Sequence, residues 1–160
     1  MKIYLDTSVV LMLDESERGI ITKDFFYFVT QNNFELFISE VVENEIKHTT
    51  KKIERDVIFT FLNTINFISL SYSEESHSLA TKYIQDGILT QNHIDDMLHV
   101  AYATVHNCDM IVSWNRKHIA KLSKIQKINA CNIKNNYHSI TICTPKEFLI
   151  LFNKESKNEN

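Results

Sequence analysis

The chain has 160 residues, of which 44% are hydrophobic and 23% charged, so it can build one domain with a substantial core but not two ordinary domains. Its formal net charge is −3, whereas most nucleic-acid-binding proteins are strongly positive. This does not exclude nucleic-acid binding, because an acidic metal site can mask basic patches elsewhere. No segment approaches the run of about 18 apolar residues that a membrane-spanning helix needs.

Cysteine usage and the start of the chain both favour a cytoplasmic protein. Cys108, Cys131 and Cys143 are odd in number and have no metal-ligand spacing, so we expect buried, reduced thiols. Asp6 interrupts the first apolar run before it reaches the length of a secretory signal sequence. We therefore expect the protein in the cytoplasm.

Apolar runs alternate with segments of helical periodicity along the first half of the chain. We predict strands over residues 2–6, 34–39 and 67–71. We predict helices over 8–13 with Thr7 or Ser8 as the cap, over 20–31 after a break at Gly19, over a segment that begins after Ser39, and over 51–65.

The same alternation continues through the second half of the chain. We predict helices over 73–86, ended by Gly87, and over 94–106, with a polar loop at 90–93 between them. We predict strands over 109–113 and 139–144, a loop that becomes helical over 114–128, and a last helix that starts at Pro145. This alternation predicts an α/β fold with a mostly parallel sheet, in one domain over 1–152, followed by a polar, disordered tail over 153–160.

Asp6 follows the first predicted strand, at the carboxyl end where an α/β sheet gathers side chains for ligand chemistry. An aspartate in this position can also cap the following helix. Thr7 and Ser8 could provide that cap instead and leave Asp6 available for a site. Several carboxylates in one pocket would repel each other unless a divalent cation offset their charge.

Further acidic residues lie on predicted helices. Glu45 lies beside the apolar Ile46 and can lean toward the rim of the sheet, and the alternative is a solvated helix face. Asp95 and Asp96 stand in the first turn of the 94–106 helix, where acids often only complement the helix dipole. Because adjacent helical residues point about 100° apart, we expect only one of the two to face an ion directly.

A polar phrase follows the predicted strand over 109–113. Asn115 can offer a carbonyl oxygen to a metal or orient a water molecule. Arg116, Lys117 and His118 can contact phosphate groups. The alternative is a capped helix start with an exposed basic turn.

Taken in order, four segments resemble the PIN-domain ribonucleases, and among them the bacterial VapC-type toxins. The matching segments are Ile3-Tyr4-Leu5-Asp6-Thr7-Ser8, then Ile38-Ser39-Glu40-Val41-Val42 with Glu45-Ile46, then Asp95-Asp96-Met97-Leu98-His99-Val100-Ala101-Tyr102-Ala103, then Cys108-Asp109-Met110-Ile111-Val112-Ser113-Trp114-Asn115-Arg116-Lys117-His118. Each motif alone is weak, but the ordered set covers almost the whole chain.

The resemblance implies a three-layer α/β/α sandwich with a central, mostly parallel sheet and a Mg²⁺- or Mn²⁺-dependent endoribonuclease site. The family's first three acids fall on Asp6, Glu45 and Asp96, which would hold the metal. Its fourth acid falls on Asn115, a neutral side chain that binds a cation more weakly. The resemblance also implies a small antitoxin that covers the cleft, and it allows a homodimer.

The expected reaction is hydrolysis of RNA phosphodiester bonds. Asp6, Glu45 and Asp96 would hold one or two Mg²⁺, partly through water, and Asn115 would orient a water molecule or a ligand. The side chains expected to hold the RNA backbone are Arg116, Lys117 and His118, with Lys47 or Lys51 in support. We expect Ser8 and Asp95 to orient the metal-binding acids without binding the metal themselves.

Three other interpretations compete with this one. Glu45 and Asp96 are each followed three residues later by a histidine, as in di-iron bundles, but such bundles need four long helices that the predicted strands disfavour. Haloacid-dehalogenase phosphatases need a second aspartate where this chain has Ser8. A PIN-like module that binds RNA or protein without useful turnover stays open, because Asn115 is neutral.

Overall fold

The computed structural model describes residues 1–48 and 52–158, and within them a five-stranded sheet forms the centre of the molecule. Its spatial order is β3-β2-β1-β4-β5, and every neighbouring pair of strands is parallel. The strands are β1 (Lys2–Leu5), β2 (Glu35–Ser39), β3 (Phe67–Leu70), β4 (Met110–Val112) and β5 (Thr141–Cys143). The predicted α/β fold with a parallel sheet is confirmed.

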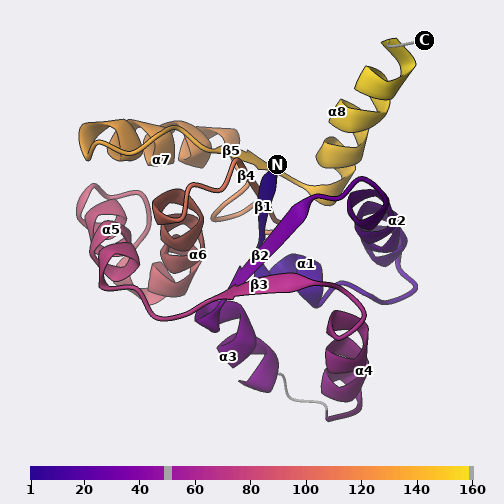
Figure 1. Ribbon diagram of the computed structural model, residues 1–160. Helices are drawn as coiled ribbons and strands as arrows, with labels where there is room; N and C mark the ends of the chain where they lie inside the picture. Colours follow the sequence, from indigo (N-terminus) through magenta and orange to yellow (C-terminus); the bar gives the residue numbers. More distant parts are fainter. Residues whose placement is uncertain (49–51, 159–160) are drawn as a thin grey trace.

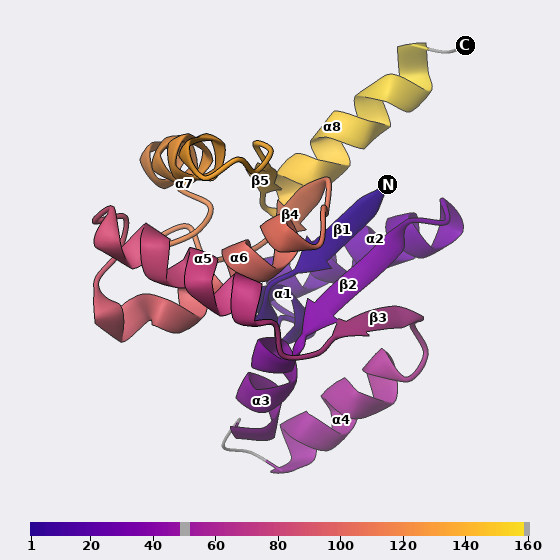
Figure 2. The same ribbon diagram turned by 60° about the vertical axis from the view of Figure 1, so that its left-hand side comes forward.

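Helices cover both faces of this sheet. Figure 1 shows α5, α6 and α7 on one side of the strands and α2 and α8 on the other, which makes three layers. In the view of Figure 2, α3 leaves the carboxyl end of β2 and α4 leads back toward β3. The helices are α1 (Thr7–Val10), α2 (Glu17–Gln31), α3 (Glu40–His48), α4 (Lys52–Leu62), α5 (Glu74–Gln85), α6 (Ile94–Val105), α7 (Leu122–Lys134) and α8 (Pro145–Asn158).

The core lies on both faces of β1, the central strand. Ile3, Tyr4 and Leu5 are fully buried, as expected for a parallel strand covered by helices on both sides. On one side, Phe148 of α8 packs against Phe25 of α2 with ring centroids 5.0 Å apart. The three cysteines are free and buried, as predicted. Within the described residues, none of the helices combines the length and the apolar character needed to cross a bilayer.

Helix boundaries differ from the prediction near the start of the chain. The first helix begins at Thr7, so neither Thr7 nor Ser8 caps it, and Asp6 occupies the cap position instead. The second helix begins at Glu17 and runs through Gly19, where we had predicted a break. Ser16 explains this difference, because its Oγ accepts a hydrogen bond from the Gly19 backbone N–H (3.1 Å) and caps the helix one turn earlier.

Gly19 is required for a reason other than helix breaking. A Cβ added to it would clash with the backbone carbonyl oxygen of Asp14. We expect Gly19→Ala to destabilise the protein by about 1–3 kcal/mol through overpacking, opposite in sign to the usual helical gain from glycine to alanine. Urea unfolding would measure this change, with Ser78→Ala on the exposed face of α5 as the control. A stabilised Gly19→Ala protein would contradict the packing described here.

The last helix is longer than predicted. It continues to Asn158, beyond residue 152, where we had expected a disordered tail to begin. Residues 153–158 contain lysine and glutamate but no glycine or proline, so no local signal ends the helix there. Residues 159–160 of the expected tail lie outside the described part of the chain. The single-domain assignment over 1–152 stays a prediction.

Candidate functional site

The candidate site lies at the carboxyl edge of the sheet, where several chain segments end or begin. Asp6 directly follows β1, and Asn115 lies in the loop after β4. Glu45 comes from α3, which follows β2, and Asp96 from the first turn of α6. Parallel strands end at the same edge, and for this reason residues far apart in the sequence meet here.

Asp6 is almost fully buried and tied to the neighbouring strand. Its side chain does not cap α1, although it occupies the cap position. The hydroxyl groups of Ser8 and Ser113 donate hydrogen bonds to its Oδ2, the latter at 2.6 Å. Ser8 Oγ in turn accepts a hydrogen bond from the Trp114 backbone N–H (2.9 Å). The Asp6 carboxylate is therefore held in one orientation by these two hydroxyl groups.

His99 stands between two of the predicted acids. Its Nε2 lies 3.1 Å from Glu45 Oε2 and 3.4 Å from Asp6 Oδ1, and only 2% of its side chain is exposed. Its Nδ1 is hydrogen-bonded to the Tyr4 hydroxyl at 2.9 Å. The Thr7 hydroxyl donates a second hydrogen bond to Glu45 Oε2. Glu45 therefore leans toward the sheet and not only toward solvent.

The electrostatics of this cluster favour a charged imidazole. Burial lowers the pKa of His99, but the charges of Asp6, Glu45 and Asp96 and the Glu45 hydrogen bond raise it above its ordinary value. Burial raises the pKa of Glu45, but the hydrogen bond and charge of His99 and the Thr7 hydroxyl bring it below its ordinary value. The charges of three carboxylates therefore affect the pKa of one imidazole. The imidazole in turn offsets part of the repulsion between these carboxylates.

Asp96 lies on the other side of this cluster and is held by three neighbours. Its Oδ1 accepts a hydrogen bond from Asn115 Nδ2 (2.7 Å). Its Oδ2 lies 2.8 Å from His118 Nδ1 and 3.5 Å from His93 Nδ1. Burial raises the pKa of Asp96 above its ordinary value, while the charge and hydrogen bond of His118 oppose that effect.

A chain of hydrogen bonds connects Asp6 to Asp96. Ser113 Oγ donates to Asp6 and accepts from the Asn115 backbone N–H (2.9 Å), and the Asn115 amide donates to Asp96. The Asn115 side-chain oxygen accepts from the His118 backbone N–H (3.0 Å). The structure thus brings together all four residues that the sequence placed in the site, although the two aspartates are connected through other side chains.

The basic side chains of the β4 loop are arranged differently from the expectation. Arg116 is exposed and forms an ion pair with Glu147 of α8. Lys117 is exposed on the same loop. His118 is turned inward against Asp96. Of these three side chains, Arg116 and Lys117 are therefore exposed to solvent, and His118 contacts the acidic cluster.

The remaining predicted residues contribute less to the cluster. Asp95 is exposed on α6, and among the described residues no hydrogen bond connects it to the acids. Lys47 is exposed on α3. Lys51 lies outside the described residues. The roles of Asp95 and Lys47 stay predictions.

The donors at this edge fit a hard divalent cation. Mg²⁺ and Mn²⁺ prefer oxygen ligands and commonly keep several bound waters. Asp6, Glu45 and Asp96 offer carboxylate oxygens, and Asp6 and Asp96 are bridged by Ser113 and Asn115. Because other side chains lie between Asp6 and Asp96, a cation here would be bound partly through water molecules. A cation here would offset the same repulsion that His99 reduces.

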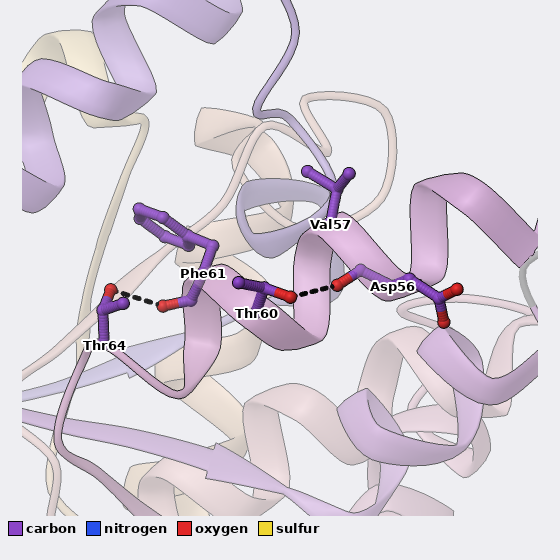
Figure 3. A pocket seen from close by; sticks show the side chains of 5 residues that line it. All are labelled: Asp56, Val57, Thr60, Phe61 and Thr64. Carbon is purple, nitrogen blue, oxygen red and sulfur yellow. Dashed lines mark hydrogen bonds between the residues drawn. The ribbon is translucent and has the colours of Figure 1, made fainter.

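The hollow drawn in Figure 3 is a poor alternative to this site. It has a volume of about 500 Å³ and runs along α4, lined by Asp56, Val57, Thr60, Phe61 and Thr64. The hydroxyls of Thr60 and Thr64 donate to backbone carbonyl oxygens of α4, at 2.7 and 2.6 Å. Asp56 is the one carboxylate among the lining residues. The residues that line this hollow therefore do not form a cluster of acidic or other reactive side chains.

Comparison with known proteins gives a fold but no sequence match. No protein-family model and no curated protein sequence matches the chain. A chain in the crystal structure of VapBC2 from Rickettsia felis bound to a DNA fragment from their promoter matches with a TM-score of 0.58 and 16% identity, over 90% of this chain and 98% of that chain. A chain in the crystal structure of FitAcB from Neisseria gonorrhoeae matches with a TM-score of 0.55 and 14% identity, over 89% and 97%.

These matches define the class of fold. The protein has a PIN-like α/β fold, with an all-parallel five-stranded sheet flanked by helices. The structural resemblance to VapC-type PIN proteins that the sequence indicated is confirmed at the level of the fold.

Some residues of the cluster were not predicted from the sequence. Ser113, Thr7 and Tyr4 were not assigned to the site, and His93 was placed in a loop without a role. His99 carried a signal, since it lies among buried apolar residues of α6 one turn after Asp96. A histidine on an apolar face is unusual enough to suggest a buried partner.

Proposed function

We propose that this protein is a Mg²⁺- or Mn²⁺-dependent endoribonuclease that hydrolyses RNA phosphodiester bonds, as a toxin-like PIN protein. The observation that carries the proposal is that Asp6, Glu45 and Asp96 meet in one network, in which His99 contacts Asp6 and Glu45, and Ser113 and Asn115 connect Asp6 to Asp96. Three carboxylates gathered at the carboxyl edge of a parallel sheet are typical of sites for divalent cations that act on phosphate. The fold that the chain shares with VapBC2 and FitAcB supports the proposal.

Each acid has a partner that fixes its orientation in this proposal. Ser113 holds Asp6, Thr7 holds Glu45, and Asn115 holds Asp96. Mg²⁺ bound by these acids would lower the pKa of a water nucleophile and offset charge on the scissile phosphate. Lys117, exposed on the neighbouring loop, would steer the RNA backbone toward the acids.

A partner and a location also belong to the proposal. A small antitoxin would cover the acidic cleft, the protein would act in the cytoplasm, and it could form a homodimer. The similar fold of chains in the crystal structures of VapBC2 and FitAcB supports the antitoxin. Expression of the chain alone should slow growth, and coexpression of the product of an adjacent small open reading frame should restore it.

The activity is tested with the purified full chain and a labelled pool of structured RNAs. Reactions contain Mg²⁺, Mn²⁺ or a chelator, and the ends of the products are analysed. Cleavage that needs the cation and leaves a free hydroxyl and a terminal phosphate without a cyclic phosphate is the expected result, because water is the nucleophile. Equal cleavage in chelator, or no cleavage with either cation, would contradict the proposal.

A second candidate function is binding of RNA or protein without useful turnover. Asn115 favours it, because this neutral side chain occupies the position expected for a fourth acid and uses its amide to hold Asp96. A site with three acids in place of four binds a cation more weakly. The effect of a carboxylate at position 115 separates the two candidates.

Asn115→Asp should make the protein more dependent on divalent cations. Without metal, two carboxylates would face each other where a hydrogen bond now exists, so we expect a loss of at least about 1 kcal/mol in stability. Mg²⁺ should then raise the melting temperature more than it does in the wild type. Thermal unfolding with and without Mg²⁺ measures both effects, and Asn44→Asp on the exposed face of α3 is the control. An unchanged response to Mg²⁺ would argue against a cation beside residue 115.

A further inference from the structure

A second cluster of possible ligands lies directly beside the acidic one. His93 comes from the 3₁₀ turn Gln91–His93 before α6, Asp96 from the first turn of α6, and His118 from the loop after β4. The two imidazole rings pack with centroids 4.1 Å apart. One ligand atom from each of the three side chains can be chosen so that all lie within 4.8 Å of one another.

The separations of the ligand atoms are compatible with a metal site. Both Nδ1 atoms are directed at the same carboxylate oxygen, Asp96 Oδ2, at 3.5 Å from His93 and 2.8 Å from His118. Zinc–ligand bonds of about 2.0–2.1 Å in a tetrahedron place ligand atoms about 3.3–3.4 Å apart. Small side-chain rotations would therefore bring all three atoms to one cation without moving the backbone.

The cluster also has the support that metal ligands usually need. Asn115 Nδ2 holds the other oxygen of Asp96, and Asn115 Oδ1 accepts the His118 backbone N–H. One amide therefore orients both the carboxylate and the segment that carries the second imidazole. Outer groups of this kind fix ligands and raise metal affinity in known sites.

We propose that His93, Asp96 and His118 form a binding site for a borderline divalent transition-metal cation, with Zn²⁺ as the best fit. Two imidazoles and one carboxylate favour Zn²⁺, Co²⁺ or Ni²⁺ over Mg²⁺ and Ca²⁺, which prefer oxygen ligands. Three protein ligands leave a coordination position for water. The side chains are 39%, 20% and 17% exposed, so the cation can enter from solvent.

This site differs in chemistry from the oxygen-rich one at Asp6 and Glu45, although Asp96 belongs to both clusters. Zn²⁺ bound to Asp96 Oδ2 would replace the two histidine contacts that this oxygen now makes. The proposal does not rest on nuclease activity, because its test measures metal binding without RNA.

The test is titration of the metal-free full chain with Co²⁺, followed by its visible absorption. We expect a saturable band at one Co²⁺ per chain, which Zn²⁺ abolishes and excess Mg²⁺ does not. His93→Gln and His118→Gln should each weaken binding at least about tenfold, because even the loss of an outer supporting group has an effect of that size. His106→Gln, which changes a histidine at the far end of α6, should keep the band.

Two results would overturn the proposal. One is the absence of a band at stoichiometric Co²⁺, and the other is a band that survives in both His93→Gln and His118→Gln. Circular dichroism checks the fold of each variant. Should His118→Gln fail to fold, His93→Gln decides alone, because His93 lies at the surface before α6.

Discussion

Asp6→Asn is expected to reduce metal-dependent RNA cleavage at least about 100-fold, the upper end of the effect of losing even an outer supporting group at a metal site. The substitution keeps the shape of the side chain, and Ser8 and Ser113 can still donate to the remaining carbonyl oxygen. What it removes is the negative charge that the cation needs. The initial rate of cleavage of a labelled RNA measures the effect.

The matched control for this prediction is Asp109→Asn. Asp109 precedes β4 at the opposite end of the sheet, and its carboxylate accepts the Lys2 backbone N–H at 2.7 Å. An asparagine can accept the same bond, so the rate should stay at the wild-type level. Full activity in Asp6→Asn, or an equal loss in both variants, would remove Asp6 from the proposed mechanism.

His99→Leu is expected to destabilise the metal-free protein by about 3–5 kcal/mol, the effect of removing one partner from a buried ion pair. Leucine cannot replace the contacts of Nε2 with Asp6 and Glu45, at 3.4 and 3.1 Å. The Tyr4 hydroxyl would also lose one of its two partners. Urea unfolding in the presence of chelator measures the free energy of unfolding.

Mg²⁺ should recover part of this loss, because a cation among the three acids would offset the repulsion between their carboxylates. His106→Leu on the same helix is the control, since His106 is only half-buried and bonds to the backbone of its own helix. A stability loss in His99→Leu that Mg²⁺ leaves unchanged would show that the acids do not bind the cation.

The architecture followed closely from the sequence because its signals are local. Apolar runs such as Ile3–Leu5 and Ile111–Val112 are short and uninterrupted, as buried parallel strands require. Helix ends were harder to predict, because they depend on capping side chains that compete with one another. Ser16 caps α2, so this helix begins at Glu17. Asp6 occupies the N-cap position of α1, where Thr7 or Ser8 was expected.

The sequence predicted the main residues of the candidate site but not all of their partners. Asp6, Glu45, Asp96 and Asn115 fall on matched motifs, and the structure places them in one network. The contacts of His99 could not be predicted, because its partners come from segments far apart in the chain. His99 meets Glu45 across 54 residues, and periodicity contains no information about such contacts.

Whether the carboxylates of Asp6, Glu45 and Asp96 hold the catalytic cation is tested by the Mg²⁺ dependence of cleavage by Glu45→Gln. Glu43→Gln is the control, since Glu43 lies on the same helix and bonds to Ser69 instead. We expect Glu45→Gln to need at least about tenfold more Mg²⁺ for half-maximal cleavage, and Glu43→Gln to match the wild type. An unchanged Mg²⁺ dependence in Glu45→Gln would show that Glu45 does not hold the catalytic cation.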